Sequence, residues 1–174
     1  MKTIPRIAPT AVLSAALALA LAAAPAGAAE VFVARVSHVT DGDTLWVVPA
    51  GGGAPRKLRL LGIDAPEICQ AGGAASRAAL QALVEHRQVE VRIRFNDSYQ
   101  RALAQLRVDG QDVAGALVLA GHAWAERWHG QPGDYAAQEA AARAAGRGVF
   151  GDPAALLPRD FRRSHGSCHA PDQR

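Results

Sequence analysis

The stretch Val89-Glu90-Val91-Arg92-Ile93-Arg94-Phe95 is the most regular part of this sequence. Apolar and charged residues alternate along it without interruption. A period of two residues places the apolar side chains on one face of an extended chain, so the stretch predicts a strand with one buried face. The segments on either side are interpreted as parts of the same sheet.

Three strands are predicted before this segment and one after it. They comprise residues 31–39, 44–48, 57–63 and 102–108. A helical period over residues 74–85 separates the third strand from the fourth, and Asp112 and Asp134 are the predicted caps of two later helices. The order β-β-β-α-β-β-α-α indicates an α+β fold, in which helices pack around a five-stranded barrel of the OB type.

The N-terminus has the pattern of a secretory signal. Lys2 and Arg6 precede an apolar run over residues 11–24, and the small residues Ala26-Gly27-Ala28 follow it. We expect residues 1–28 to be removed on export to the periplasm or the medium, which leaves no membrane segment. The alternative is an uncleaved N-terminal anchor, although the apolar run is shorter than the roughly 20 residues of a spanning helix.

The rest of the chain has the composition of one packed domain. The sequence has 174 residues, of which 49% are hydrophobic, and this excludes a disordered, collagen-like or disulfide-dense chain. We expect the domain to cover residues 29–151 and residues 152–174 to form an irregular tail. Nothing in the sequence indicates an oligomer, so a monomer is expected.

Charge excludes one kind of nucleic-acid binding. Without the two basic residues of the signal, 17 basic residues face 16 acidic ones. Such a balanced chain does not bind a polyanion through bulk charge, so any such binding needs a local site. The arginines of the tail, Arg159, Arg162 and Arg163, are interpreted as a solvated face, with contact to nucleic acid as the alternative.

Two cysteines, Cys69 and Cys168, are present in a chain expected to be exported. Export favours a disulfide between them, and free thiols or an intermolecular bond are the alternatives. A bridge would close a long loop, worth about 4–5 kcal/mol in the chain-entropy model. It would hold the tail next to the segment that follows Glu67.

Acidic residues gather in two predicted turns, Asp41-Gly42-Asp43 and Asp64-Ala65-Pro66-Glu67. Carboxylates from separate turns can converge on a hard cation such as Ca²⁺, which prefers oxygen ligands. Taken singly, both motifs also fit ordinary turn chemistry. Arg59 lies five residues before Asp64, on the predicted strand that leads into the second turn, and Arg101 closes the loop over residues 97–101. Guanidinium groups suit a phosphate on which negative charge develops. Together these groups are the parts that metal-assisted phosphodiester hydrolysis requires.

The sequence resembles the staphylococcal nuclease (thermonuclease) family over about residues 31–150. The matching stretches are Val39-Thr40-Asp41-Gly42-Asp43-Thr44-Leu45, Arg59-Leu60-Leu61-Gly62-Ile63-Asp64-Ala65-Pro66-Glu67, Asp97-Ser98-Tyr99-Gln100-Arg101-Ala102-Leu103-Ala104, and Ala142-Arg143 with Arg147-Gly148-Val149-Phe150. The resemblance implies a calcium-dependent endonuclease that cleaves DNA and RNA with little sequence specificity and leaves 3′-phosphate ends. Single-stranded or denatured DNA would be the preferred DNA substrate.

The resemblance also implies a role for each matching residue. Asp43 and Asp64 would bind Ca²⁺ through their carboxylates and Ala65 through its carbonyl, with Asp41 behind these ligands. Glu67 would activate the attacking water. Roles on the nucleic acid would fall to Arg59 at the scissile phosphate, Arg101 at the transition state and Tyr99 beside the nucleotide.

One residue departs from the family pattern. The family loop usually has glycine where this chain has Gln100. If that glycine adopts a positive φ, glutamine would cost about 1–2 kcal/mol there or change the turn, and Arg101 would then point differently. The alternative function is therefore a weak or inactive module of the same fold that binds nucleic acid or protein. A metal-independent phosphodiesterase would leave the paired aspartates without a role.

Overall fold

A computed structural model describes residues 29–97, 101–166 and 168 of the protein. The predicted signal peptide, residues 1–28, lies outside the described residues. Within the described part of the chain, no helix has the length and apolar content needed to cross a bilayer.

Five strands form the predicted barrel. They are β1 (Glu30–Val39), β2 (Thr44–Pro49), β3 (Arg56–Leu60), β5 (Gln88–Asn96) and β6 (Ala102–Val108). Neighbours in the order β3-β2-β1-β5-β6 are antiparallel, and a parallel pairing of β3 with β6 closes the barrel. The OB-type barrel predicted from the strand pattern is therefore confirmed.

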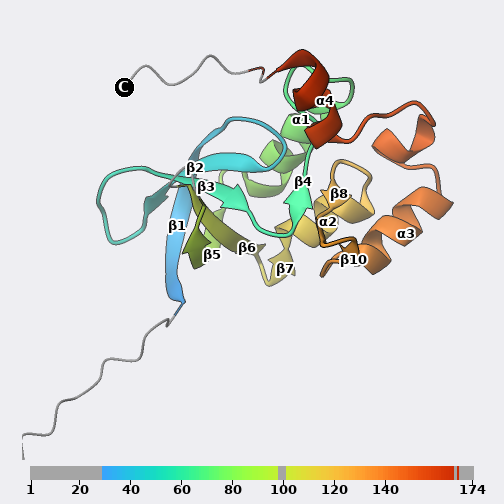
Figure 1. The fold of residues 1–174 in the computed structure, drawn as a ribbon. Coiled ribbons are helices and arrows are strands. Elements are labelled where there is room, and N and C mark those ends of the chain that lie inside the picture. The colour runs from blue at the N-terminus through green and yellow to red at the C-terminus, as the bar shows by residue number, and fades with distance from the viewer. Residues whose placement is uncertain (1–28, 98–100, 167, 169–174) are drawn as a thin grey trace, which may run out of the picture.

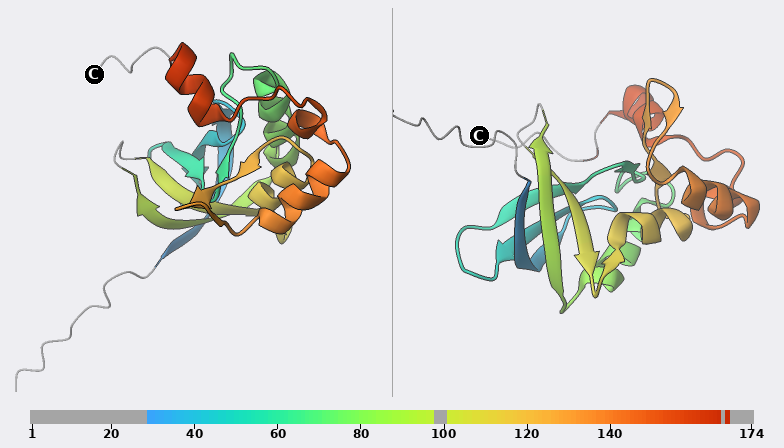
Figure 2. Two further views of the ribbon diagram at one scale, coloured as in Figure 1. Left: turned by 45° about the vertical axis from the view of Figure 1, so that its right-hand side comes forward. Right: turned by 90° about the horizontal axis from the view of Figure 1, so that it is seen from below.

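Helices pack against the barrel as predicted, and the described residues form one α-helix more than expected. They are α1 (Gly73–Val84), α2 (Val113–Leu119), α3 (Ala136–Ala144) and α4 (Pro158–His165), with a 3-10 helix at Gly148–Gly151. Figure 1 shows the barrel strands on one side of the molecule and α2 and α3 on the other. In both views of Figure 2, α4 lies outside the barrel.

Five short strands complete the structure. β4 (Ile63–Asp64) pairs with β8 (Trp124–Ala125), β9 (Arg127–Trp128) with β10 (Gln131–Pro132), and β7 (Gln111–Asp112) with the end of β6. The pairing of β4 with β8 sets Asp64 opposite Trp124. This pairing therefore attaches the acidic turn that follows β3 to the helical side of the molecule.

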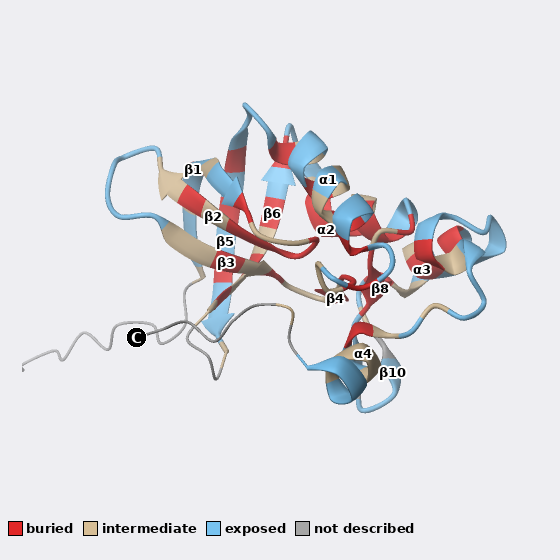
Figure 3. Ribbon diagram, turned by 90° about the horizontal axis from the view of Figure 1, so that it is seen from above, coloured by how far each residue is buried: buried red, intermediate tan, exposed pale blue. Residues whose placement is uncertain are grey.

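The core lies inside the barrel and continues beneath α1 and α2. Figure 3 shows buried residues along the strands and along these helices. The fully buried side chains include Leu45, Val47, Leu58, Leu80, Val91, Leu106 and Leu117. The alternation of β5 places Val89, Val91 and Ile93 in this core and leaves Phe95 exposed at the strand end.

Three local predictions are corrected. The third strand ends at Leu60 rather than continuing to residue 63, because Gly62 has a φ of 82° and turns the chain before β4. Asp134 is not a helix cap, since α3 begins after Tyr135 without a side-chain cap. The tail contains α4, which begins at Pro158. Asp112, in contrast, caps α2 as predicted, with Oδ1 2.8 Å from the Gly115 N–H.

Candidate active site

The two acidic turns lie against each other because Gly42 has no side chain. A Cβ atom on Gly42 would lie 2.7 Å from the Cβ of Ala65 and 2.6 Å from the Cβ of Ser76 in α1. Asp43 is almost fully buried beside this contact, and its Oδ2 accepts the Ala65 N–H at 3.0 Å. Glycine in the Asp-Gly-Asp motif is thus required for close packing, and this packing brings Asp43 to Asp64-Ala65.

Arg59 joins the two aspartates. Its Nη1 lies 2.6 Å from Asp43 Oδ1, and its Nη2 lies 2.8 Å from Asp64 Oδ1. Arg59 is mostly buried, with 19% of its side chain exposed. Two of the five guanidinium N–H groups make these bonds, so three remain for another partner.

The cluster carries more negative charge than Arg59 neutralises. Asp41 lies beside Asp43, with Oδ1 3.0 Å from the Asp43 N–H. Burial, together with the charge of Asp43, raises the pKa of Asp41 to about 6. Burial also raises the pKa of Asp64, and the charge of Arg59 offsets only part of that effect. Such raised values mark a site at which an added cation would be stabilised.

Glu67 lies at the edge of the same cluster, in the turn before α1. Its carbonyl accepts the Gln70 N–H at 2.8 Å and its own N–H donates to Gln70 Oε1 at 3.1 Å. Its side chain is 13% exposed and lies 2.6 Å from Arg162 in α4. Arg162 also lies 3.5 Å from Asp64. The tail arginine predicted to be solvated is therefore part of the cluster.

Strand pairing places Arg101 next to the strand that carries Arg59. β6 begins at Ala102, which lies opposite Leu58 of β3, so Arg101 is placed one strand away from Arg59. Asp97 holds it there, with Oδ2 2.7 Å from both Nε and Nη2. The predicted substrate residue Tyr99 and the divergent Gln100 lie outside the described residues.

The predicted disulfide is present. Cys69 and Cys168 are bonded, with their Cα atoms 5.7 Å apart and a sequence separation of 99. Cys69 lies two residues after Glu67. The bridge therefore holds Cys168 beside the candidate site.

The donor set suits a hard cation, because Asp43, Asp64 and the Ala65 carbonyl supply only oxygen atoms. Their surplus of negative charge would stabilise a cation there. Among the described residues, no group of three or more His, Cys, Asp or Glu side chains is arranged as a metal site. An ion would therefore depend on these two carboxylates, the main chain and water.

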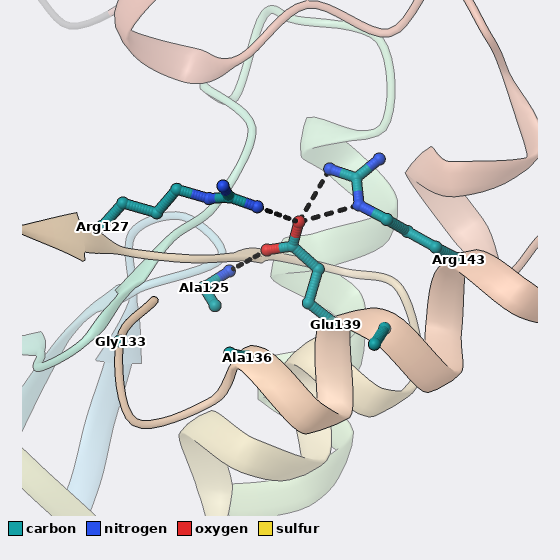
Figure 4. A pocket seen from close by; sticks show the side chains of 7 residues that line it. Ala125, Arg127, Gly133, Ala136, Glu139 and Arg143 are labelled. Carbon is teal, nitrogen blue, oxygen red and sulfur yellow. Dashed lines mark hydrogen bonds and ion pairs between the residues drawn. The ribbon is translucent and has the colours of Figure 1, made fainter. Parts of the chain in front are cut away.

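A second group of charged residues surrounds Glu139, away from the aspartates. Figure 4 shows Glu139 between Arg127 and Arg143 at a small pocket, with Ala125 beneath it. Glu139 Oε2 accepts the Ala125 N–H at 2.8 Å, and Oε1 lies 2.7 Å from Arg143 and 3.8 Å from Arg127. One carboxylate thus contacts two arginines and a main-chain donor. We interpret this arrangement as a structural contact that holds α3 against β8.

Two features of the candidate site were not predicted from the sequence. Asp97, which holds Arg101, was visible only as a loop residue. Arg162 had a usable signal, because a bridge to Cys69 brings residues shortly before Cys168 close to Glu67. Its exact target could not be predicted, since it depends on the direction of a helix that the sequence did not reveal.

Comparisons with known proteins show the family of the chain. The family model described as "Staphylococcal nuclease homologue" matches residues 57–151. An uncharacterized endonuclease of Haemophilus influenzae is 35% identical over 129 residues, which cover 74% of this chain and 72% of that protein. Protein ParB of Escherichia coli is 35% identical, covering 86% and 89%. A micrococcal nuclease of Shigella flexneri is 33% identical, covering 76% and 82%. The chain belongs to the staphylococcal nuclease homologue family.

Proposed function

We propose that this protein is an exported, calcium-dependent endonuclease that hydrolyses DNA and RNA with little sequence specificity and leaves 3′-phosphate ends. The observation that carries the proposal is the Arg59 guanidinium between Asp43 and Asp64, with Glu67 at the edge of the same cluster. Nuclease activity on nucleic acids is supported by the family. The cation, the product ends, the preference for single-stranded or denatured DNA and the monomeric state are further parts of the proposal.

The chain's own groups would share the reaction as follows. Glu67 would take a proton from the attacking water, whose oxygen forms the new bond to phosphorus. The bond from phosphorus to the 5′-oxygen breaks, and this oxygen takes a proton from solvent. Arg59 would hold the scissile phosphate with its three remaining N–H groups, and Arg101 would donate to the charge that develops in the transition state.

Asp43, Asp64 and the Ala65 carbonyl would hold Ca²⁺, and Asp41 would support Asp43 from behind. When bound, Ca²⁺ would act as a Lewis acid toward a phosphoryl oxygen. Little base specificity is expected, because Arg59, Arg101 and Glu67 address phosphate and water rather than base edges. Tyr99 is proposed to lie beside the nucleotide. The signal pattern in residues 1–28 supports export to the periplasm or the medium.

The test is cleavage of heat-denatured DNA by the purified protein, first with Ca²⁺ and then with excess chelator. Product ends are identified by asking whether a polymerase extends them only after phosphatase treatment. Calcium-dependent cleavage with blocked 3′ ends is the expected result. A folded protein that binds Ca²⁺ but cleaves neither DNA nor RNA would contradict the proposal and favour a binding module.

A further inference from the structure

The C-terminal helix places a second guanidinium group on the carboxylates of the candidate site. Arg162 Nη1 lies 2.6 Å from Glu67 Oε1. Nη1 and Nη2 each lie 3.5 Å from one oxygen of Asp64. The side chain is 37% exposed, so the guanidinium faces the carboxylates on one side and solvent on the other.

Both ends of α4 are fastened near Glu67. Before the helix, Gln70 Nε2 donates to the Leu156 carbonyl at 2.6 Å, and Pro158 at the first helical position is buried. After the helix, Cys168 is bonded to Cys69. The two attachments keep the main chain of α4 near Glu67, so only the side chain of Arg162 has to move to reach another partner.

The neighbours of Arg162 are groups that the proposed reaction needs for other purposes. Asp64 is a proposed cation ligand and Glu67 the proposed acceptor of the water proton. A cation at Asp64 would remove part of the attraction that holds Arg162 there, because both positive groups compete for the same oxygens. A guanidinium released from a carboxylate can make the same two parallel hydrogen bonds to two oxygens of a phosphate.

We propose that Arg162 is a third substrate-binding guanidinium, which rests on Glu67 and Asp64 in the free protein and transfers to a phosphate of the bound strand. This inference rests on the proposed function. It assigns a substrate contact to the helix after the family domain, and it gives the Cys69–Cys168 bridge the role of holding that contact in place. Arg162 would have the same kind of role as Arg59 and Arg101, which is to bind phosphate rather than bases.

The test compares Arg162→Ala and Arg162→Lys with Arg163→Ala. Arg163 is a matched control, since it lies on the same helix, is 77% exposed and pairs with Asp160 rather than with the cluster. With heat-denatured DNA and Ca²⁺, Arg162→Ala should raise KM roughly tenfold with little change in kcat, because one charge-assisted contact is lost. Arg162→Lys should recover part of the loss, and Arg163→Ala should match the unchanged protein.

Binding gives a readout that does not depend on turnover. The same substitutions are combined with Glu67→Gln, which prevents cleavage. A fluorescein-labelled single-stranded oligonucleotide is then titrated with each variant protein in the presence of Ca²⁺ at several salt concentrations. Removing one phosphate contact should reduce the slope of log K against log salt by about 0.7. The Arg163→Ala control should leave the slope unchanged.

The bridge is tested with Cys69→Ser and Cys168→Ser together. This variant should bind the oligonucleotide more weakly, and Arg162→Ala should then add less to the loss than it does in the bridged protein. Full additivity would overturn the role of the bridge. An unchanged slope for Arg162→Ala, or a rise in kcat/KM that indicates a purely inhibitory contact, would overturn the inference. Absence of cleavage and binding by the unchanged protein would instead reject the proposed function.

Discussion

Asp43 and Glu139 are both buried carboxylates held by arginines, yet their surroundings differ in charge. Glu139 is alone with Arg127, Arg143 and the Ala125 N–H. Asp43 shares Arg59 with Asp64, and Asp41 lies directly behind it. The Glu139 group has positive charge to spare, whereas the Asp43 cluster has a surplus of negative charge.

This difference separates a structural ion pair from a candidate site. Buried like charges do not add to stability, so a surplus of carboxylates is an arrangement that an added cation would stabilise. The two groups are also connected through β8, because the Ala125 N–H of this strand donates to Glu139 and Trp124 of the same strand lies opposite Asp64 in β4. Substitutions in the Asp43 cluster should affect catalysis, whereas substitutions in the Glu139 group should affect stability.

The largest expected effect is on turnover. Glu67→Gln keeps the size of the side chain but removes the group that accepts the water proton, so kcat should fall by about 10²–10⁴-fold. The variant should still fold, because Glu67 lies at the edge of the cluster and outside the core. Initial rates and thermal unfolding of the same preparation test both statements. Unchanged turnover would remove Glu67 from the proposed mechanism.

The next effect is on the cation. Asp64→Asn retains an oxygen but loses the charge that would attract Ca²⁺, so the affinity for Ca²⁺ should fall by roughly 10–100-fold. Isothermal titration calorimetry measures this directly. Arg127→Ala is a suitable control, because Arg127 is exposed and belongs to the Glu139 group. Equal Ca²⁺ affinity in the Asp64 variant and the unchanged protein would place the cation elsewhere.

Glu139→Ala should act on stability instead. It leaves the buried Ala125 N–H without its acceptor, and the free energy of unfolding should fall by about 2 kcal/mol. The exposed arginines Arg127 and Arg143 would return to water at little cost. Turnover per folded molecule should change by less than about twofold. Urea unfolding measures the stability, and initial rates divided by the concentration of folded protein measure the turnover. A large loss of turnover with unchanged stability would show that Glu139 acts in catalysis rather than in stability.

The smallest expected effect is an increase in the free energy of unfolding. Asp41→Asn keeps an acceptor for the Asp43 N–H and removes one buried like charge. In the presence of chelator at neutral pH, the free energy of unfolding should therefore rise by about 1 kcal/mol. Urea unfolding of the variant and the unchanged protein measures the difference. A loss of stability would show that the negative charge of Asp41 is already compensated, and the contrast with Glu139 would disappear.

Much of this arrangement could be predicted from the sequence, because it depends on local patterns. The alternation in β5 and the helical period of α1 determine which side chains face the core, and the acidic turns follow from their neighbouring strands. The pairing of Cys69 with Cys168 was the single intramolecular possibility. The extent of the third strand was predicted less well, since the left-handed turn at Gly62 interrupts an otherwise continuous apolar segment.

Other features were decided only by the tertiary structure. Arg162 and Glu67 are 95 residues apart in sequence, and Arg59 of β3 contacts Asp43 in the turn before β2. No periodicity encodes such contacts, because they depend on the pairing of β2 with β3, the close approach at Gly42 and the direction of α4. The sequence by itself determined the barrel, the family and the types of residue at the candidate site. Only folding decided which charges meet, because burial and distance set whether an arginine is a solvated tail residue or a partner of Glu67.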